Sequence, residues 1–174
     1  IEVSRPPSYG SARDLKKGLL FDGNDKTGYG WRTAYAFPVI LLIDLGEEKT
    51  FDAISVTALG GNRPFELPFY RVLAGQSPEK MHVIVENHDR DNLPLHNAEH
   101  SRFPLTSTFS AIRARYLIVD VKPMGYFAGL QEIEIRESES GESPSGKSVK
   151  YEDYYEYEYL GNSCPYPTQR YVTP

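Results

Sequence analysis

The sequence has 174 residues, 40% of them hydrophobic, which suits one globular domain with a further segment attached. Its 19 basic and 24 acidic residues give a net charge of −5, which excludes the basic footprint of a nucleic-acid-binding protein. The 13 Pro and 14 Gly favour a turn-rich all-β fold over a helical one.

The negative charge is concentrated towards the C-terminus. From Glu137 onward there are seven acidic and three basic residues, so residues 1–136 carry a net charge of only −1. No apolar run reaches the roughly 20 residues that a membrane-spanning helix needs, so we expect no transmembrane segment. The single cysteine, Cys164, cannot form an internal disulfide, so cysteine usage does not indicate an oxidising compartment.

The first strong strand signal is the continuous apolar run over residues 39–45. An apolar run bounded by turn residues predicts a strand buried on both faces. Residues 51–59 predict a second strand, with Ile54, Val56 and Ala58 on one face.

Short strands separated by turn and loop sequences follow along the chain. The close spacing of these strands indicates antiparallel hairpins. Polar or Gly/Pro-rich loops are predicted over residues 60–68 and 86–101. The predicted strands are residues 69–74, 81–85, 103–109, 114–121 and 129–135.

The C-terminal part has a different composition. Residues 137–150 are of low complexity and predict a solvated linker, and residues 151–174 predict an acidic, tyrosine-rich tail. In Tyr151–Tyr159, five tyrosines alternate with four acidic residues. Alternation is compatible with a strand that has one aromatic face, but the charge density favours exposure.

Four sequence motifs together resemble a known family. They are the turn DGNDKT (residues 22–27) with Trp31 after it, the strand LLIDLG that ends at Gly46, the pair Arg115-Tyr116, and the closing strand in which Leu130, Glu132, Ile133 and Glu134 follow an L-x-E-i-e pattern. This set resembles coagulation factor 5/8 type C (discoidin) domains and the related family 32 carbohydrate-binding modules of the galactose-binding-like superfamily.

The resemblance covers roughly residues 19–136 and implies a jelly-roll β-sandwich of about eight antiparallel strands, in agreement with the strand count above. We therefore expect residues 1–136 to form the discoidin-like domain, followed by the linker (137–150) and the tail (151–174). The chain departs from the family in two respects. It lacks the tryptophan that often follows the middle turn, here residues 75–81, and it cannot form the terminal disulfide of many animal members.

The DGNDKT turn is a candidate calcium site, because Ca²⁺ prefers carboxylate and carbonyl oxygens. The resemblance implies a structural calcium with ligands from Leu19, Asp22, Asp25, Thr27 and Glu132. The plainer interpretation is an Asx turn, with Glu132 solvated.

The ligand-binding surface is expected in two loops, which the resemblance brings to one end of the sandwich. Polar side chains there would bond to hydroxyl or acidic groups, and apolar ones would stack on a ring or enter a lipid headgroup region. The alternative is that the apolar residues only plug the end of the barrel. The candidates are Asn62, Arg63, Phe65, Leu67, Tyr126 and Phe127.

Other motifs are weaker candidates for binding or catalysis. Trp31 could stack on a sugar, but the resemblance favours a core position for it. His96, Glu99 and His100 match the H-x-x-E-H string of zinc peptidases, but that motif works only on a helix, and here it lies in a polar loop. We find no nucleophile elbow or phosphate-binding loop, so we expect no catalytic residues.

We therefore expect a non-catalytic, extracellular carbohydrate-binding module, that is, a lectin-like protein with a structural calcium. The alternative is a cell-adhesion module that binds a protein or anionic lipid through the same loops. In that case Tyr151–Tyr159 would bind a basic protein partner, and sulfation of its tyrosines would add to its negative charge. The plainer interpretation of that run is a solvated spacer.

Overall fold

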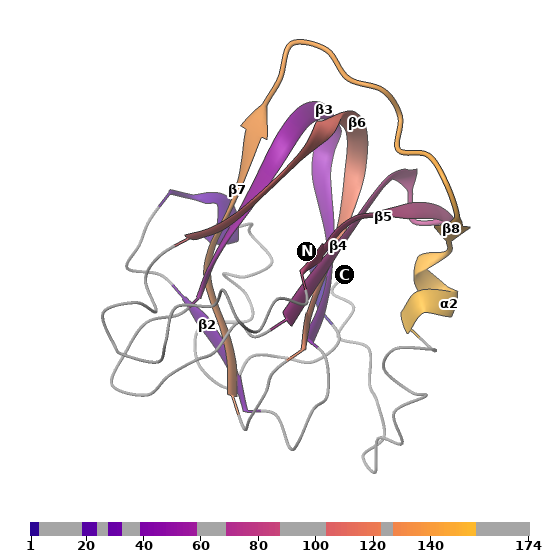
Figure 1. The fold of residues 1–174 in the computed structure, drawn as a ribbon. Coiled ribbons are helices and arrows are strands. Elements are labelled where there is room, and N and C mark those ends of the chain that lie inside the picture. The colour runs from indigo at the N-terminus through magenta and orange to yellow at the C-terminus, as the bar shows by residue number, and fades with distance from the viewer. Residues whose placement is uncertain are drawn as a thin grey trace.

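A computed structural model of the chain describes residues 1–3, 19–23, 28–32, 39–58, 69–87, 104–122 and 127–155. These residues form eight strands, a 3-10 turn (η1) and a short helix (α2) (Figure 1). The elements are β1 (Glu2–Val3), η1 (Leu19–Phe21), β2 (Tyr29–Arg32), β3 (Val39–Ala58), β4 (Phe69–Ser77), β5 (Lys80–Asn87), β6 (Pro104–Lys122), β7 (Phe127–Glu137), β8 (Ser148–Val149) and α2 (Tyr151–Tyr155).

All strand pairs are antiparallel, in the order β2-β7-β3-β6-β4-β5-β8, with β1 on β3. The long strands β3 and β6 bend and contribute to both layers of a sandwich (Figure 1). The first layer contains β1, the first part of β3, the last part of β6, then β4, β5 and β8. The second layer contains the first part of β6, the last part of β3, then β7 and β2. The predicted all-β sandwich is confirmed.

Two pairs of predicted strands are each one strand in the structure. Residues 39–45 and 51–58 belong to β3, and residues 104–109 and 114–121 belong to β6. The separation into two strands was wrong for β3, because the polar stretch after Asp44 interrupts the apolar pattern without ending the strand. It is instead a bulge, in which the register jumps from Asp44 opposite Tyr116 to Lys49 opposite Ala114.

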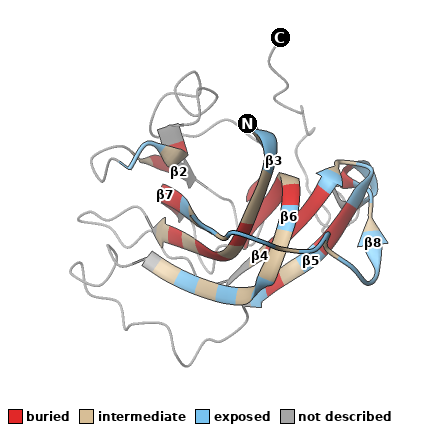
Figure 2. Ribbon diagram, turned by 90° about the horizontal axis from the view of Figure 1, so that it is seen from above, coloured by how far each residue is buried: buried red, intermediate tan, exposed pale blue. Residues whose placement is uncertain are grey.

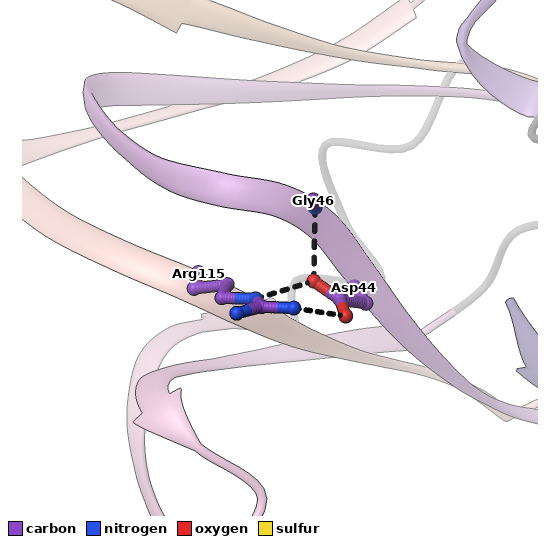
Figure 3. Close-up of polar contacts among 3 residues, drawn as sticks. All are labelled: Asp44, Gly46 and Arg115. Atoms are coloured by element: carbon purple, nitrogen blue, oxygen red, sulfur yellow. Dashed lines mark hydrogen bonds and ion pairs between the residues drawn. The ribbon is translucent and has the colours of Figure 1, made fainter.

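An ion pair closes this bulge and joins two of the family-like motifs (Figure 3). Arg115 donates Nε and Nη2 hydrogen bonds to the two carboxylate oxygens of Asp44, at 2.8 and 2.9 Å. Asp44 Oδ1 also accepts a 2.9 Å bond from the N–H of Gly46, whose φ of 85° suits glycine. The guanidinium lies 5.2 Å from the centroid of the Tyr116 ring.

The hydrogen bond from Arg115 lowers the pKa of Asp44 to about 2. The strings DLG and RY therefore meet in space as one structural clamp. Its position in the fold gives these motifs a structural role rather than a ligand-binding one.

The main core lies between the layers and draws apolar side chains from β2 to β7 and from η1. Phe51 of β3 packs edge-on against Phe109 of β6, with ring centroids 5.9 Å apart. The largest fully buried side chains of this core are Leu20, Leu41, Ile43, Phe51, Ile54 and Leu117.

A second apolar cluster covers the outer face of the first layer. It contains Ile40, Leu73, Met81 and Ile118, none of them exposed, and Tyr151 of α2, which is 3% exposed. Together with the main core this buries both faces of the first part of β3, as its continuous apolar run predicted. Figure 2 shows the buried residues of the central strands and the exposed β8 beside them.

The segment expected to be a solvated linker is mostly exposed but is attached to the sandwich. It arches from β7 to β8 (Figure 1), and Glu142 exchanges backbone hydrogen bonds with Ala111 and Arg113 of β6. β8 then pairs with β5, and Tyr151 starts α2 rather than a strand.

The closing strand departs from simple alternation, which would place Leu130, Glu132 and Glu134 on one face and Gln131, Ile133 and Ile135 on the other. Leu130 and Ile133 both belong to the main core, because the register shifts between Ala58 opposite Leu130 and Thr57 opposite Glu132. The extra residue in β7, Gln131, changes the face on which Leu130 lies.

Candidate functional site

The strand ends that flank the predicted ligand loops meet at one end of the first layer. Phe69, which follows the first loop, is paired with Lys122, which precedes the second. Tyr70 is paired with Asn87, so β5 ends there too. Arg32 and Phe127 pair where β2 ends and β7 begins.

The predicted ligand residues therefore belong to segments that leave neighbouring strand ends. Asn62, Arg63, Phe65, Leu67 and Tyr126 themselves lie outside the described residues. Phe127 is the first residue of β7, and its side chain is also outside the description. Their role as a binding surface stays a prediction.

The turn proposed to bind calcium lies against β7. η1 packs on this strand, Leu20 is buried in the main core, and Gly23 has a φ of 67°, as the tight turn required. Asp22 is exposed. Asp25 and Thr27 lie outside the described residues.

Glu132 is the carboxylate that the resemblance places with this turn. It is only 7% exposed, and both carboxylate oxygens are shielded from solvent. The expectation that Glu132 is solvated, which was part of the plainer interpretation, is wrong; the Asx turn itself lies largely outside the described residues. A buried carboxylate requires hydrogen bonds or a cation nearby.

A hollow of about 510 Å³ brings this carboxylate and the turn together. Residues from η1, the turn, β3 and β7 form its wall, so Gly23 and Glu132 border the same space. Of these wall residues, Ser55 and Arg136 had no sequence signal. The lining residues are Phe21, Gly23, Ser55, Glu132, Ile133, Glu134, Ile135 and Arg136.

The polar side chains around the hollow are joined to their neighbours. Ser55 and Thr106 share a 2.7 Å hydrogen bond between their hydroxyls. Arg136 donates a 2.6 Å bond to Asp52 and thereby lowers the pKa of that carboxyl. Ser55 lies between Thr106 on β6 and Glu134 on β7 in the register, so a row of polar side chains crosses the outer face of the second layer.

No group of three or more His, Cys, Asp or Glu side chains is placed to hold a metal within the described ranges. A calcium at the turn would thus need backbone carbonyls, such as that of Leu19, and ligands from residues 24–27. This is the mixture that Ca²⁺ accepts.

The remaining candidates lie largely outside the description. His96, Glu99 and His100 are not among the described residues, and neither is Cys164. Trp31 pairs through its backbone with Ala128, but its side chain is not described. None of the described helices is long and apolar enough to cross a membrane.

Neither a family model nor a curated protein sequence matches the chain, but several solved structures share its fold. The family 32 carbohydrate-binding module of NanJ from Clostridium perfringens, solved with galactose, has a TM-score of 0.58 at 19% identity over 76% of this chain and 89% of that one. CBM32-3, from a family 31 glycoside hydrolase of the same organism, has a TM-score of 0.59 at 19% identity over 78% and 91%.

A third structure is CpGH89CBM32-5 from Clostridium perfringens, solved with GalNAc-β-1,3-galactose. It has a TM-score of 0.56 at 16% identity over 74% of this chain and 84% of that one. At such identities the likeness establishes the fold. The chain shares the β-sandwich fold of these family 32 carbohydrate-binding modules, as its motifs predicted.

Proposed function

We propose that the chain is a non-catalytic, extracellular carbohydrate-binding module that recognises a galactose-type glycan through its end loops. The observation that carries this proposal is the shared fold with modules solved in complex with galactose and GalNAc-β-1,3-galactose. Fold alone does not fix function, so the proposal also depends on loop side chains that can bind a sugar.

The loop residues have the chemistry that a sugar requires. Asn62 and Arg63 offer amide and guanidinium donors for hydroxyls. Aromatic rings suit the apolar face of a pyranose, and Phe65, Tyr126 and Phe127 supply them in the two segments that flank the paired ends Phe69 and Lys122. Leu67 adds apolar surface.

We further propose that a structural calcium binds at the turn after η1. Its ligands would be the Leu19 carbonyl, Asp22, Asp25, Thr27 and Glu132. The burial of the Glu132 carboxylate beside this turn supports the proposal. The ion would tie the start of the domain to its last long strand, and it would have no catalytic role.

The test is binding of the labelled full chain to a broad glycan array, in calcium and in EDTA. We expect hits among galactose-type glycans. Loss of these hits in EDTA would show that the ion supports the binding fold. A blank array would contradict carbohydrate recognition, and anionic liposomes and basic proteins would be tested next as the alternative ligands.

Arg63→Ala sharpens this test. Removing a charged hydrogen-bond donor should weaken glycan binding by about tenfold or more and leave the melting temperature unchanged. Arg113→Ala is the matched control, because Arg113 is an exposed arginine near the bulge, away from the loop end. Equal glycan affinities for Arg63→Ala and Arg113→Ala would show that the glycan does not bind at the loop that contains Arg63.

A further inference from the structure

The outer face of the first layer is closed by the C-terminal part of the chain. Ile40, Leu73, Met81 and Ile118 come from four different strands and are fully buried there. Tyr151, from α2, completes the cluster. A contiguous apolar face of this kind would be a large exposed patch on a soluble domain if it were uncovered. We call residues 138–155, from which Val149 and Tyr151 pack on this cluster, the C-terminal strap.

Besides the 2.9 Å hydrogen bond from the N–H of Ser138 to the carbonyl of Thr50, where the strap leaves β7, the backbone fastens the strap at three places. Near its start, the N–H of Arg113 donates to the carbonyl of Glu142 at 2.7 Å, and the N–H of Glu142 donates to Ala111 at 3.1 Å. In its middle, β8 pairs with Met81 and His82 of β5. At its end, the N–H of Tyr151 donates to the carbonyl of Pro78 at 2.7 Å.

The first fastening is also close-packed. A Cβ added to Gly141 would lie 2.8 Å from the backbone of Ala111, closer than real side chains come. Glycine at this position therefore lets the strap reach the edge of β6. Elsewhere the strap has mostly exposed side chains. Its attachment therefore depends on these few points, on the half-buried Val149, which packs against the cluster, on the 3.7 Å ion pair of Lys150 with Glu79, and on one buried ring.

Tyr151 is that ring, and it differs from the two residues after it. It is 3% exposed, whereas Glu152 and Asp153 are exposed. It is also the first tyrosine of the acidic run Tyr151–Tyr159. An enzyme that adds an anionic group to a tyrosine must take the phenol into its own active site, which requires this ring to leave the cluster. Once charged, the ring could not return without the cost of burying the charge.

We propose that the C-terminal strap covers the apolar cluster on the outer face of the first layer and that the buried Tyr151 ring holds it there. The strap can then be docked, or Tyr151 can carry an anionic group, but not both at once. The first tyrosine of the run is then a switch position. Its modification holds the strap open and uncovers the apolar face formed by Ile40, Leu73, Met81 and Ile118. This proposal is independent of the glycan-binding function.

Amide hydrogen exchange on the full chain tests the closure. The amides of Arg113, Glu142 and Tyr151 donate the hydrogen bonds that fasten the strap, so they should be protected in the wild type. Tyr151→Glu should speed exchange at Glu142 and Tyr151 by at least about tenfold and increase binding of an apolar dye. Tyr151→Phe, the matched control, should change neither. Equal exchange in wild type and Tyr151→Glu would overturn the proposal.

A chemical measurement on the unmodified chain covers the case in which Tyr151→Glu fails to fold. Tyrosine nitration by tetranitromethane, followed site by site by mass spectrometry, should modify Tyr151 at least about tenfold more slowly in native buffer than in mild denaturant that releases the strap. Nitration of Tyr151 at the same rate in both conditions would show that the ring is not pinned.

Discussion

The two parts of β3 have the same backbone structure but opposite surroundings. In the first part, Val39, Ile40, Leu41 and Ile43 are all buried, because the strand lies between the main core and the C-terminal strap. In the second part, burial alternates between core residues and the half-exposed Ser55 and Thr57. The comparison shows that a continuous apolar run requires a covering element on each side, and that an alternating run requires only one.

The covering element came from a segment whose composition predicted solvation. Low complexity and charge describe most of its side chains correctly, since most of residues 138–150 are exposed. A buried tyrosine, the half-buried Val149 and a few hydrogen bonds attach it. The average composition of a segment does not reveal single residues that attach it to the rest of the domain.

The largest effects are expected from substitutions on the two faces of the first part of β3. They compare how much each face contributes to the free energy of unfolding. Leu41→Ala and Ile40→Ala each remove a fully buried side chain, from the main core and from the outer cluster respectively. Each should lower the free energy of unfolding by about 3 kcal/mol, measured by denaturant titration. A loss below about 1 kcal/mol for Ile40→Ala alone would mean that the strap cover is loose in solution.

The next effect concerns the second layer, where Glu132 is buried beside the turn. If calcium binds there, saturating calcium at about 100 times its Kd should stabilise the chain by about 2.7 kcal/mol, seen as a higher melting temperature than in EDTA. Glu132→Gln should abolish the difference, and Glu139→Gln, at an exposed glutamate that does not line the hollow, should keep it. The same melting temperature in calcium and in EDTA for the wild type would exclude the ion.

A smaller effect is expected from the clamp that joins the two parts of β3. Asp44→Asn removes the ion pair with Arg115, and because the Asp44 side chain is 41% exposed, solvent screening limits the loss to about 1 kcal/mol. The pKa of Asp44 is lowered from 3.8 to about 2. The stabilisation is therefore complete above pH 3.8 and is lost as the pH falls towards 2.

Denaturant titrations of wild type and Asp44→Asn at neutral pH and near pH 2 measure this directly. The difference in unfolding free energy should shrink at the acidic pH. An unchanged difference would mean that the effect of Asp44→Asn does not come from the charge of Asp44.

The smallest effect is expected on the outer face of the second layer. Ser55→Ala removes the hydroxyl that bonds to Thr106 at a position that is only half-buried. The expected loss of unfolding free energy is about 0.5 kcal/mol. A loss as large as that of Ile40→Ala would mean that this face, too, is covered, and the contrast between the two parts of β3 would fail.

The sequence by itself determined the fold class and most strand positions, because side-chain periodicity and turn residues act locally. It also identified the clamp, though only as the motifs DLG and RY, and it named Glu132 through family resemblance. Tertiary structure decided what local patterns cannot encode. The bulge after Asp44 keeps β3 continuous because Arg115, distant in the sequence, binds it there. The bulge at Gln131 turns Leu130 inward, and Tyr151 finds a buried position only because Ile40, Leu73, Met81 and Ile118 converge on one face.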